Sequence, residues 1–107
     1  MNGTDRIWYT YIVRCADGSL YTGYTVDDLA ARIAAHNEGR GARYTKSRRP
    51  VTLVWHQEFS DAHDARSLEA KIKRLSKKEK EALVRGGTEV VLSSFGIGGA
   101  KLNAEKN

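Results

Sequence analysis

The sequence predicts an α+β fold in which helices flank a three-stranded antiparallel β-sheet, in the order β-β-α-β-α-α. Two segments rich in β-branched and aromatic residues flank an Asp-Gly pair near the amino terminus, which is typical of a hairpin. A third such segment lies at 51–59, and apolar residues at helical spacing follow both the hairpin and this segment. At 107 residues the chain is long enough for one domain and too short for two.

The first two strands are expected at 7–15 (IWYTYIVRC) and 20–25 (LYTGYT), where residues with high strand preference dominate. Asp17-Gly18 lies between them and is a strong signal for a tight turn. A three-residue loop at this point requires Gly18 to adopt the left-handed conformation of a bulge.

The length of this turn decides which side chains share a face of the sheet. A two-residue turn pairs Cys15 with Leu20 and places Tyr11 and Tyr21 on opposite faces. A three-residue loop pairs Val13 with Tyr21 and places the two tyrosines on the same face. A shared role for the tyrosines requires the second arrangement or a longer turn of the same parity.

A first helix is expected to begin where Thr25 and Asp28, three residues apart, form a capping box. It should end near Gly39 or Gly41, because glycine readily adopts the conformation that stops a helix. The segment 39–50 (GRGARYTKSRRP) is expected to be a loop, and it contains five cationic residues and no acidic one.

The third strand is expected at 51–59 (VTLVWHQEF), and Ser60 is expected to cap the helix that follows. The apolar stripe of this helix consists of Ala65, Leu68, Ile72 and Leu75. Ser76 and Glu79 form a second capping box, so we expect the helix to bend or restart there.

Charge and cysteine content narrow the classes of function. The formal net charge of +5 favours an anionic partner such as nucleic acid. A single cysteine excludes an internal disulfide and fits a reducing, cytoplasmic compartment. Neither a signal peptide nor a membrane span is expected, because no apolar run approaches about 18 residues. The domain should occupy 7–86, between a flexible segment at 1–6 and a loosely ordered tail at 87–107.

Three polar residues on the expected helices are of the types that phosphodiester hydrolysis needs. Arg32 and His36 are four residues apart and project from one helix face, and Glu69 lies beside the apolar stripe of the second helix. Hydrolysis needs a hard oxygen ligand for a metal, a cation for the phosphate and a proton acceptor for water. Each residue alone also has a structural interpretation: Arg32 and His36 as a solvated face, and Glu69 as the partner of Lys73.

The order of these residues resembles the GIY-YIG endonuclease superfamily over roughly residues 7 to 85. Tyr9-Thr10-Tyr11 stands where the family has its GIY motif, and Tyr21-Thr22-Gly23 where it has YIG. The further matching positions are Arg32, His36, Tyr44 and Glu69. The segment from Arg43 to Pro50 is similar to a branch of small bacterial single-domain members, which is itself similar to the catalytic domain of nucleases acting on branched DNA. The lysine that some members carry directly after YIG is Tyr24 here.

The resemblance implies a role for each matched residue. Tyr11 would be the general base or orient the attacking water, and Tyr21 would hydrogen-bond within the site and help to place the phosphate. Arg32 would neutralise the phosphate, His36 would assist the attack or the positioning, and Glu69 would hold one Mg²⁺ or Mn²⁺ ion. Since a free tyrosine has a pKa of about 10, Arg32 and the metal would have to make deprotonation of Tyr11 easier.

The expected function is that of a metal-dependent endonuclease that hydrolyses DNA, with structure-selective or weakly specific cutting, in DNA repair or recombination. The alternative is a nucleic-acid-binding module on the same scaffold that cuts weakly or needs a protein partner. The residues leave RNA open as a substrate. Under either interpretation the phosphates would be contacted by Arg40, Arg43, Tyr44, Lys46, Arg48 and Arg49.

Overall fold

The computed structural model describes residues 6–86 and has the predicted α+β architecture. The elements are β1 (Trp8–Arg14), β2 (Leu20–Val26), α1 (Leu29–Asn37), α2 (Arg43–Lys46), β3 (Thr52–Phe59), α3 (Ala62–Lys73) and α4 (Lys77–Val84). The strands form one antiparallel sheet in the order β2-β1-β3, so β1 is central and β2 is an edge. The predicted flexible start at 1–6 and the predicted tail at 87–107 lie outside the described residues, apart from Arg6.

The hairpin between β1 and β2 has the register that places the two tyrosines on one face. Val13 pairs with Tyr21, and Tyr11 pairs with Gly23. The turn closes with a hydrogen bond of 2.8 Å from the Cys15 amide to the Ser19 carbonyl, and Gly18 within it has a φ of 87°. The three-residue loop is therefore correct and the two-residue turn is excluded.

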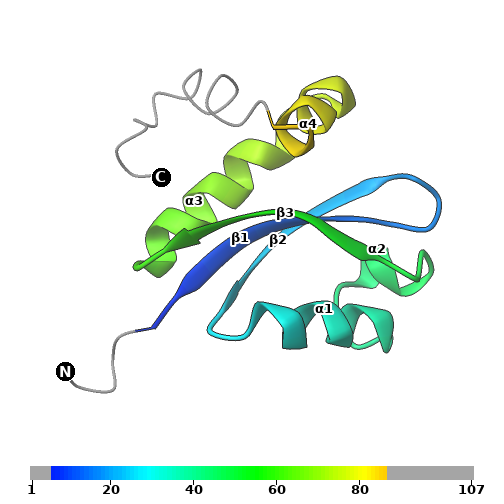
Figure 1. Cartoon of the computed structure of the whole chain (residues 1–107), viewed down its shortest axis with the longest axis horizontal. Helices are drawn as coiled ribbons and strands as arrows, with labels where there is room; N and C mark the ends of the chain where they lie inside the picture. Colours follow the sequence, from blue (N-terminus) through cyan, green and yellow to red (C-terminus); the bar gives the residue numbers. More distant parts are fainter. Residues whose placement is uncertain (1–5, 87–107) are drawn as a thin grey trace.

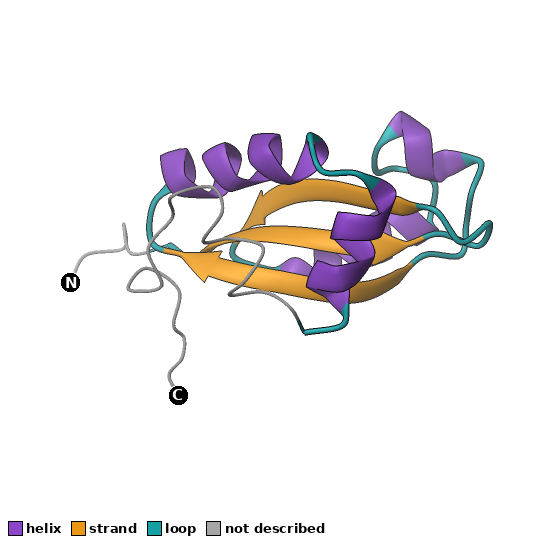
Figure 2. Ribbon diagram, turned by 90° about the horizontal axis from the view of Figure 1, so that it is seen from above, coloured by secondary structure: helices purple, strands orange, loops and turns teal. Residues whose placement is uncertain are grey.

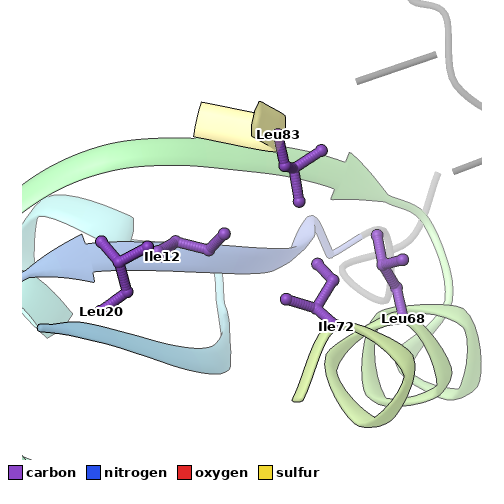
Figure 3. Close-up of a cluster of buried hydrophobic side chains, with 5 residues drawn as sticks. All are labelled: Ile12, Leu20, Leu68, Ile72 and Leu83. Carbon is purple, nitrogen blue, oxygen red and sulfur yellow. The ribbon is translucent and has the colours of Figure 1, made fainter. Parts of the chain in front are cut away.

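Helices cover both faces of the sheet, with α3 and α4 on one side and α1 and α2 on the other (Figure 1). Figure 2 looks onto the first of these faces, where α3 runs along the sheet and α4 crosses in front of the strands. The core on this side consists of Ile12, Leu20, Leu68, Ile72 and Leu83 (Figure 3). The opposite core consists of Tyr11, Val13, Cys15 and Val51. No helix in the described part of the chain is long and apolar enough to cross a membrane.

Two of the three predicted helix starts are wrong by a few residues. The cap of α1 is Asp28 itself, whose carboxylate accepts a hydrogen bond of 2.9 Å from the Ala31 amide. Thr25 cannot cap this helix because it lies within β2. The cap of α3 is Asp61, not Ser60, and it accepts from the His63 amide at 3.0 Å. In both cases an aspartate performs the capping, three residues after the expected position in α1 and one residue after it in α3.

The remaining helix boundaries agree with the sequence, with one addition. Ser76 and Glu79 form the predicted capping box at the start of α4, and α1 ends just before Gly39, which has a φ of 83°. The segment 39–50, predicted to be a loop, contains the four-residue helix α2. Thr45 anchors this helix, because its side chain is fully buried against α1.

Candidate active site

One face of the sheet brings the hydroxyl of Tyr11 together with two side chains of α1. The Tyr11 oxygen lies 2.8 Å from Nε2 of His36, and Nε of Arg32 donates to the same oxygen at 3.3 Å. The ring of His36 meets the rings of both Tyr11 and Tyr21 edge-on, with centroids 5.8 and 5.5 Å apart. Four of the predicted site residues therefore form one cluster, in which His36 contacts both tyrosines and Arg32 contacts Tyr11.

Burial favours the uncharged forms of Tyr11 and His36. Tyr11 and His36 are both fully buried. Burial raises the pKa of Tyr11, and the neighbouring Arg32 offsets this only in part. Burial also lowers the pKa of His36, and the positive charge of Arg32 acts in the same direction. The expectation that Arg32 eases the deprotonation of Tyr11 is therefore correct for its direction, but burial outweighs it.

Two glycines give the cluster the space that it occupies. A Cβ atom on Gly23, the last residue of the YIG-like segment, would lie 2.7 Å from the Tyr11 hydroxyl oxygen. A Cβ atom on Gly41 would collide with Nδ1 of His36. Any larger residue at either position must displace a ring of the cluster or the backbone.

Glu69 approaches the cluster from the opposite side of the sheet. It lies on α3, and its carboxylate is 3.2 Å from the ammonium nitrogen of Lys73 in an i,i+4 ion pair. That nitrogen is also 5.8 Å from the centre of the Tyr21 ring. Because Tyr21 belongs to the edge strand β2, these side chains meet at the edge of the sheet. The negative charge of Glu69 is close enough to contribute to the raised pKa of Tyr11.

The donor chemistry at this edge fits one hard divalent ion. Mg²⁺ is commonly bound by one or two carboxylates, with water and substrate phosphate completing its shell. Glu69 supplies one carboxylate, and its side chain is 19% exposed. A second group of possible ligands, Asp61, His63 and Asp64, lies at the start of α3. Asp61 is already used as the helix cap there.

The environment of Tyr21 differs from its predicted one. Tyr21 was expected to hydrogen-bond within the site, but its hydroxyl has no hydrogen-bond partner among residues 6–86. Its ring instead stacks on that of Tyr44, with centroids 6.0 Å apart and planes inclined by 20°. The stack continues to Arg48, whose guanidinium carbon lies 3.8 Å from the centre of the Tyr44 ring. Tyr44 is thereby held next to the cluster while 38% of its surface stays exposed.

The basic segment is partly occupied by contacts within the molecule. Arg40 pairs with Glu38, and Arg48 pairs with Asp17 at 3.2 Å. Arg49 donates to the backbone carbonyls of Lys46 at 2.9 Å and Asn37 at 3.3 Å, which ties the ends of α1 and α2 together.

Two cationic side chains of this segment are not neutralised by a partner among the described residues. The side chains of Arg43 and Lys46 have no hydrogen-bond or ion-pair partner within the described part of the chain. Both belong to α2, so they lie on the same short helix as Tyr44 and Thr45.

Two residues of the site were missed by the sequence interpretation. Thr45 accepts or donates a hydrogen bond of 2.8 Å at Nδ1 of His36, on the ring edge opposite Tyr11. Lys73 was considered as the structural partner of Glu69, and its position near the Tyr21 ring was not predicted. The spacing of Glu69 and Lys73 is a signal for the ion pair, whereas nothing in the spacing of His36 and Thr45 indicates their contact.

Comparison with known proteins identifies the family of this chain. The model of the GIY-YIG catalytic domain matches residues 7–82. The chain belongs to the GIY-YIG family. Members of this family are generally endonucleases that depend on a divalent metal. The predicted resemblance is thus confirmed.

The relatives carry family names without an assigned activity. A UPF0213 protein of Lacticaseibacillus paracasei is 48% identical over 79 residues, which cover 74% of this chain and 88% of that protein. A UPF0213 protein of Desulfotalea psychrophila is 46% identical over 102 residues, with coverages of 90% and 92%. The solution NMR structure of a UPF0213 protein from Bacillus halodurans is 41% identical, covers 82% of this chain and 95% of that one, and has a TM-score of 0.49.

Proposed function

We propose that this GIY-YIG domain is an endonuclease that hydrolyses phosphodiester bonds in DNA with one Mg²⁺ or Mn²⁺ ion. The observation that carries the proposal is the Tyr11 hydroxyl, which is bracketed by Nε of Arg32 and Nε2 of His36. A phenol in this position has a cation beside it to bind the phosphate and a base beside it to receive its proton. Packing alone does not require either neighbour.

The proton path runs from the attacking water through Tyr11 to His36. Water gives a proton to the Tyr11 oxygen while the Tyr11 proton passes to Nε2 of His36. The water oxygen forms a bond to phosphorus, the bond from phosphorus to the leaving oxygen breaks, and the leaving oxygen takes a proton from solvent. Burial lowers the pKa of His36, so the imidazole is neutral and free to accept a proton, but it is a weaker base than an exposed histidine.

Access to the Tyr11 hydroxyl depends on Arg32. Tyr11 is fully buried and Arg32 donates to its oxygen. A phosphate that binds the guanidinium would draw Arg32 toward it and open the hydroxyl to the attacking water. Arg32 would then offset the charge that develops on the phosphate. Substrate binding and activation of the base are in this way coupled through one side chain.

Glu69 is the residue that would hold the metal ion. Bound there, a divalent ion supplies positive charge that stabilises the phosphate oxygens and the leaving oxygen. To accept the ion, the Glu69 carboxylate would have to lose its ion pair with the ammonium of Lys73. Released from this pair, Lys73 would leave a positive charge near the edge of the sheet, where it favours the approach of an anionic substrate.

The basic segment supports a nucleic-acid substrate that is recognised mainly through its phosphate backbone. Arg43 and Lys46 are available for phosphates, and the net charge of +5 favours a polyanion. A domain of this size offers little surface for recognising a base sequence. We therefore expect structure-selective or weakly specific cutting of DNA, in repair or recombination. Binding should weaken steeply as salt rises.

The test uses the purified full chain with Mg²⁺ or Mn²⁺ and end-labelled duplex, flap, junction and single-stranded DNA, together with the matching RNA strands. Glu69→Ala should abolish cutting while retaining binding. Glu58→Ala, which removes an exposed carboxylate from β3, should cut like the original chain. Cutting that survives Glu69→Ala refutes the metal assignment. Binding without cutting in every substrate favours the alternative, a nucleic-acid-binding module that needs a partner.

A further inference from the structure

A buried chain of hydrogen bonds continues beyond His36 and ends in the backbone of α2. Nε2 of His36 lies 2.8 Å from the Tyr11 hydroxyl, and Nδ1 lies 2.8 Å from the Thr45 hydroxyl. The Thr45 hydroxyl in turn donates to the carbonyl of Ala42 at 3.0 Å. The Tyr11, His36 and Thr45 residues are all fully buried, so solvent does not complete these bonds.

The number of available protons decides which group donates and which accepts in this chain of hydrogen bonds. A threonine hydroxyl has one proton, and here it goes to the Ala42 carbonyl. The Thr45 oxygen must then accept from Nδ1, which places the imidazole proton on Nδ1 and leaves Nε2 without one. The bare Nε2 accepts the proton of Tyr11. Each side-chain proton in this arrangement has an acceptor, whereas the backbone amide of Ala42, which lies 3.4 Å from Nδ1, then faces a protonated nitrogen.

The opposite arrangement leaves a buried proton unpaired. If Thr45 donated to Nδ1, the imidazole proton would lie on Nε2 and point at the Tyr11 oxygen. That oxygen already receives Nε–H of Arg32, so the phenolic proton itself would have no acceptor among the described residues. A buried unpaired donor costs about 1–3 kcal/mol. The first arrangement is therefore favoured, because it gives up only the long, part-buried contact of the Ala42 amide with Nδ1.

We propose that Thr45 is a positioning residue that fixes the proton of His36 on Nδ1, so that Nε2 is held ready to take the proton of Tyr11. The inference rests on the proposed function for its catalytic consequence, whereas the position of the imidazole proton is a property of the folded protein alone. Thr45 touches neither the substrate nor the reacting atoms, and it acts only through His36.

Removal of the Thr45 hydroxyl should reverse the tautomer. The backbone amide of Ala42 points toward Nδ1 at 3.4 Å. Once Thr45 no longer accepts from Nδ1, this amide is the remaining polar group there, and it can only donate. The imidazole proton then moves to Nε2, which donates to Tyr11 and can no longer accept from it. Tyr11 would keep its neighbours but lose its base.

The first measurement is made on the full chain without substrate. Nitrogen-15 NMR of imidazole-labelled protein distinguishes a protonated ring nitrogen from a bare one, and we expect a protonated Nδ1 and a bare Nε2 in His36. In Thr45→Val the two signals should exchange, and in Thr45→Ser they should stay as in the original chain. Thr22→Val is the matched control, because Thr22 is also buried but its hydroxyl has no partner among the described residues.

The second measurement is cleavage with the same variants. Thr45→Val should cut about 100-fold more slowly, which is the lower end of what a general base contributes, while Thr45→Ser recovers most of the rate. A bare Nδ1 in the original chain overturns the proposal, even if Thr45→Val does not fold. So does a slow Thr45→Ser with a normal NMR spectrum. If no chain cuts DNA but the tautomer reverses in Thr45→Val, the proposed function fails and the assignment of Thr45 as the residue that fixes His36 stands.

Discussion

Lys73 lies one helical turn after Glu69, and its ammonium nitrogen is 3.2 Å from the Glu69 carboxylate. The residue that would hold the metal is thus already paired with a cation of the same helix. The exposed fractions of the two side chains differ, at 51% for Lys73 and 19% for Glu69. The lysine can therefore move into solvent, while the carboxylate stays at the site.

Loss of this lysine should tighten metal binding. In Lys73→Met the ion no longer competes with an ammonium group, and an exposed i,i+4 pair contributes about 0.3–0.5 kcal/mol. The Kd for Mn²⁺, measured by titration calorimetry without DNA, should fall by about twofold or more, since removal of a nearby positive charge adds to the effect. Lys71→Met makes the same change of charge on α3 without contacting Glu69. Equal tightening in both variants would show that the ion pair plays no part.

Tyr11 and His36 should behave as one unit in catalysis. Tyr11→Phe removes the hydroxyl and His36→Gln removes the proton acceptor, and each should slow single-turnover cleavage by about 10²–10⁴-fold. Because both act on the same proton, the double variant should be hardly slower than the slower single variant. Multiplicative losses would mean that the two side chains act independently. Binding of DNA to each variant, measured in parallel, separates slow chemistry from weak binding.

The strands and the place of the turn could be predicted because local features determine them, whereas the register followed only from the requirement that two tyrosines share a face. Asp17-Gly18 fixes the place of the turn, and only a loop of odd length brings Tyr11 and Tyr21 to one face. The capping box of Ser76 and Glu79 was equally predictable, since both partners lie within one helical turn.

The contacts around His36 could not be predicted, because they depend on tertiary packing. The helix α2 is four residues long, has no side-chain cap and is held by the buried Thr45. Lys73 reaches Tyr21 only because α3 lies beside the edge strand β2. Neither relationship leaves a periodic pattern in the sequence, so the segment was interpreted as a loop and the contact of Lys73 with Tyr21 was not predicted.

Gly23→Ala should damage the site more than the fold. The added methyl group would lie 2.7 Å from the Tyr11 oxygen and 2.8 Å from the ring carbon that carries it, so the phenol must shift from its present position between Arg32 and His36. Overpacking of this kind typically costs about 1–3 kcal/mol of stability. Cleavage should fall about as far as in Tyr11→Phe, at temperatures where circular dichroism still shows the folded protein. A variant that keeps its full cleavage rate would show that the position of Tyr11 tolerates such a displacement.

Thr22→Val should stabilise the protein. The Thr22 side chain is buried on the face packed by α3, and its hydroxyl has no hydrogen-bond partner in the described region. Valine has nearly the same shape and removes the unpaired polar group, so the free energy of unfolding should rise by about 1 kcal/mol in urea denaturation. Thr10→Val is the matched opposite, because the Thr10 hydroxyl donates to the Ala65 carbonyl at 2.8 Å. It should destabilise the protein, and a gain from both substitutions would contradict the explanation.

The ion pair of Arg14 and Glu81 should make the stability of the fold depend on pH in the acidic range. Both terminal guanidinium nitrogens of Arg14 lie 2.8 Å from the Glu81 carboxylate, and together with the neighbouring Lys77 they lower the pKa of Glu81 from 4.5 to about 2. A carboxyl with a depressed pKa in the folded state contributes stability above its unfolded pKa and loses it as the pH falls through its folded pKa. Glu81→Gln should therefore be less stable than the original chain above about pH 4.5, and this difference should shrink toward pH 2. Urea denaturation of both proteins between pH 7 and pH 2 measures the difference, and a value independent of pH would refute the assignment of the shift to this pair.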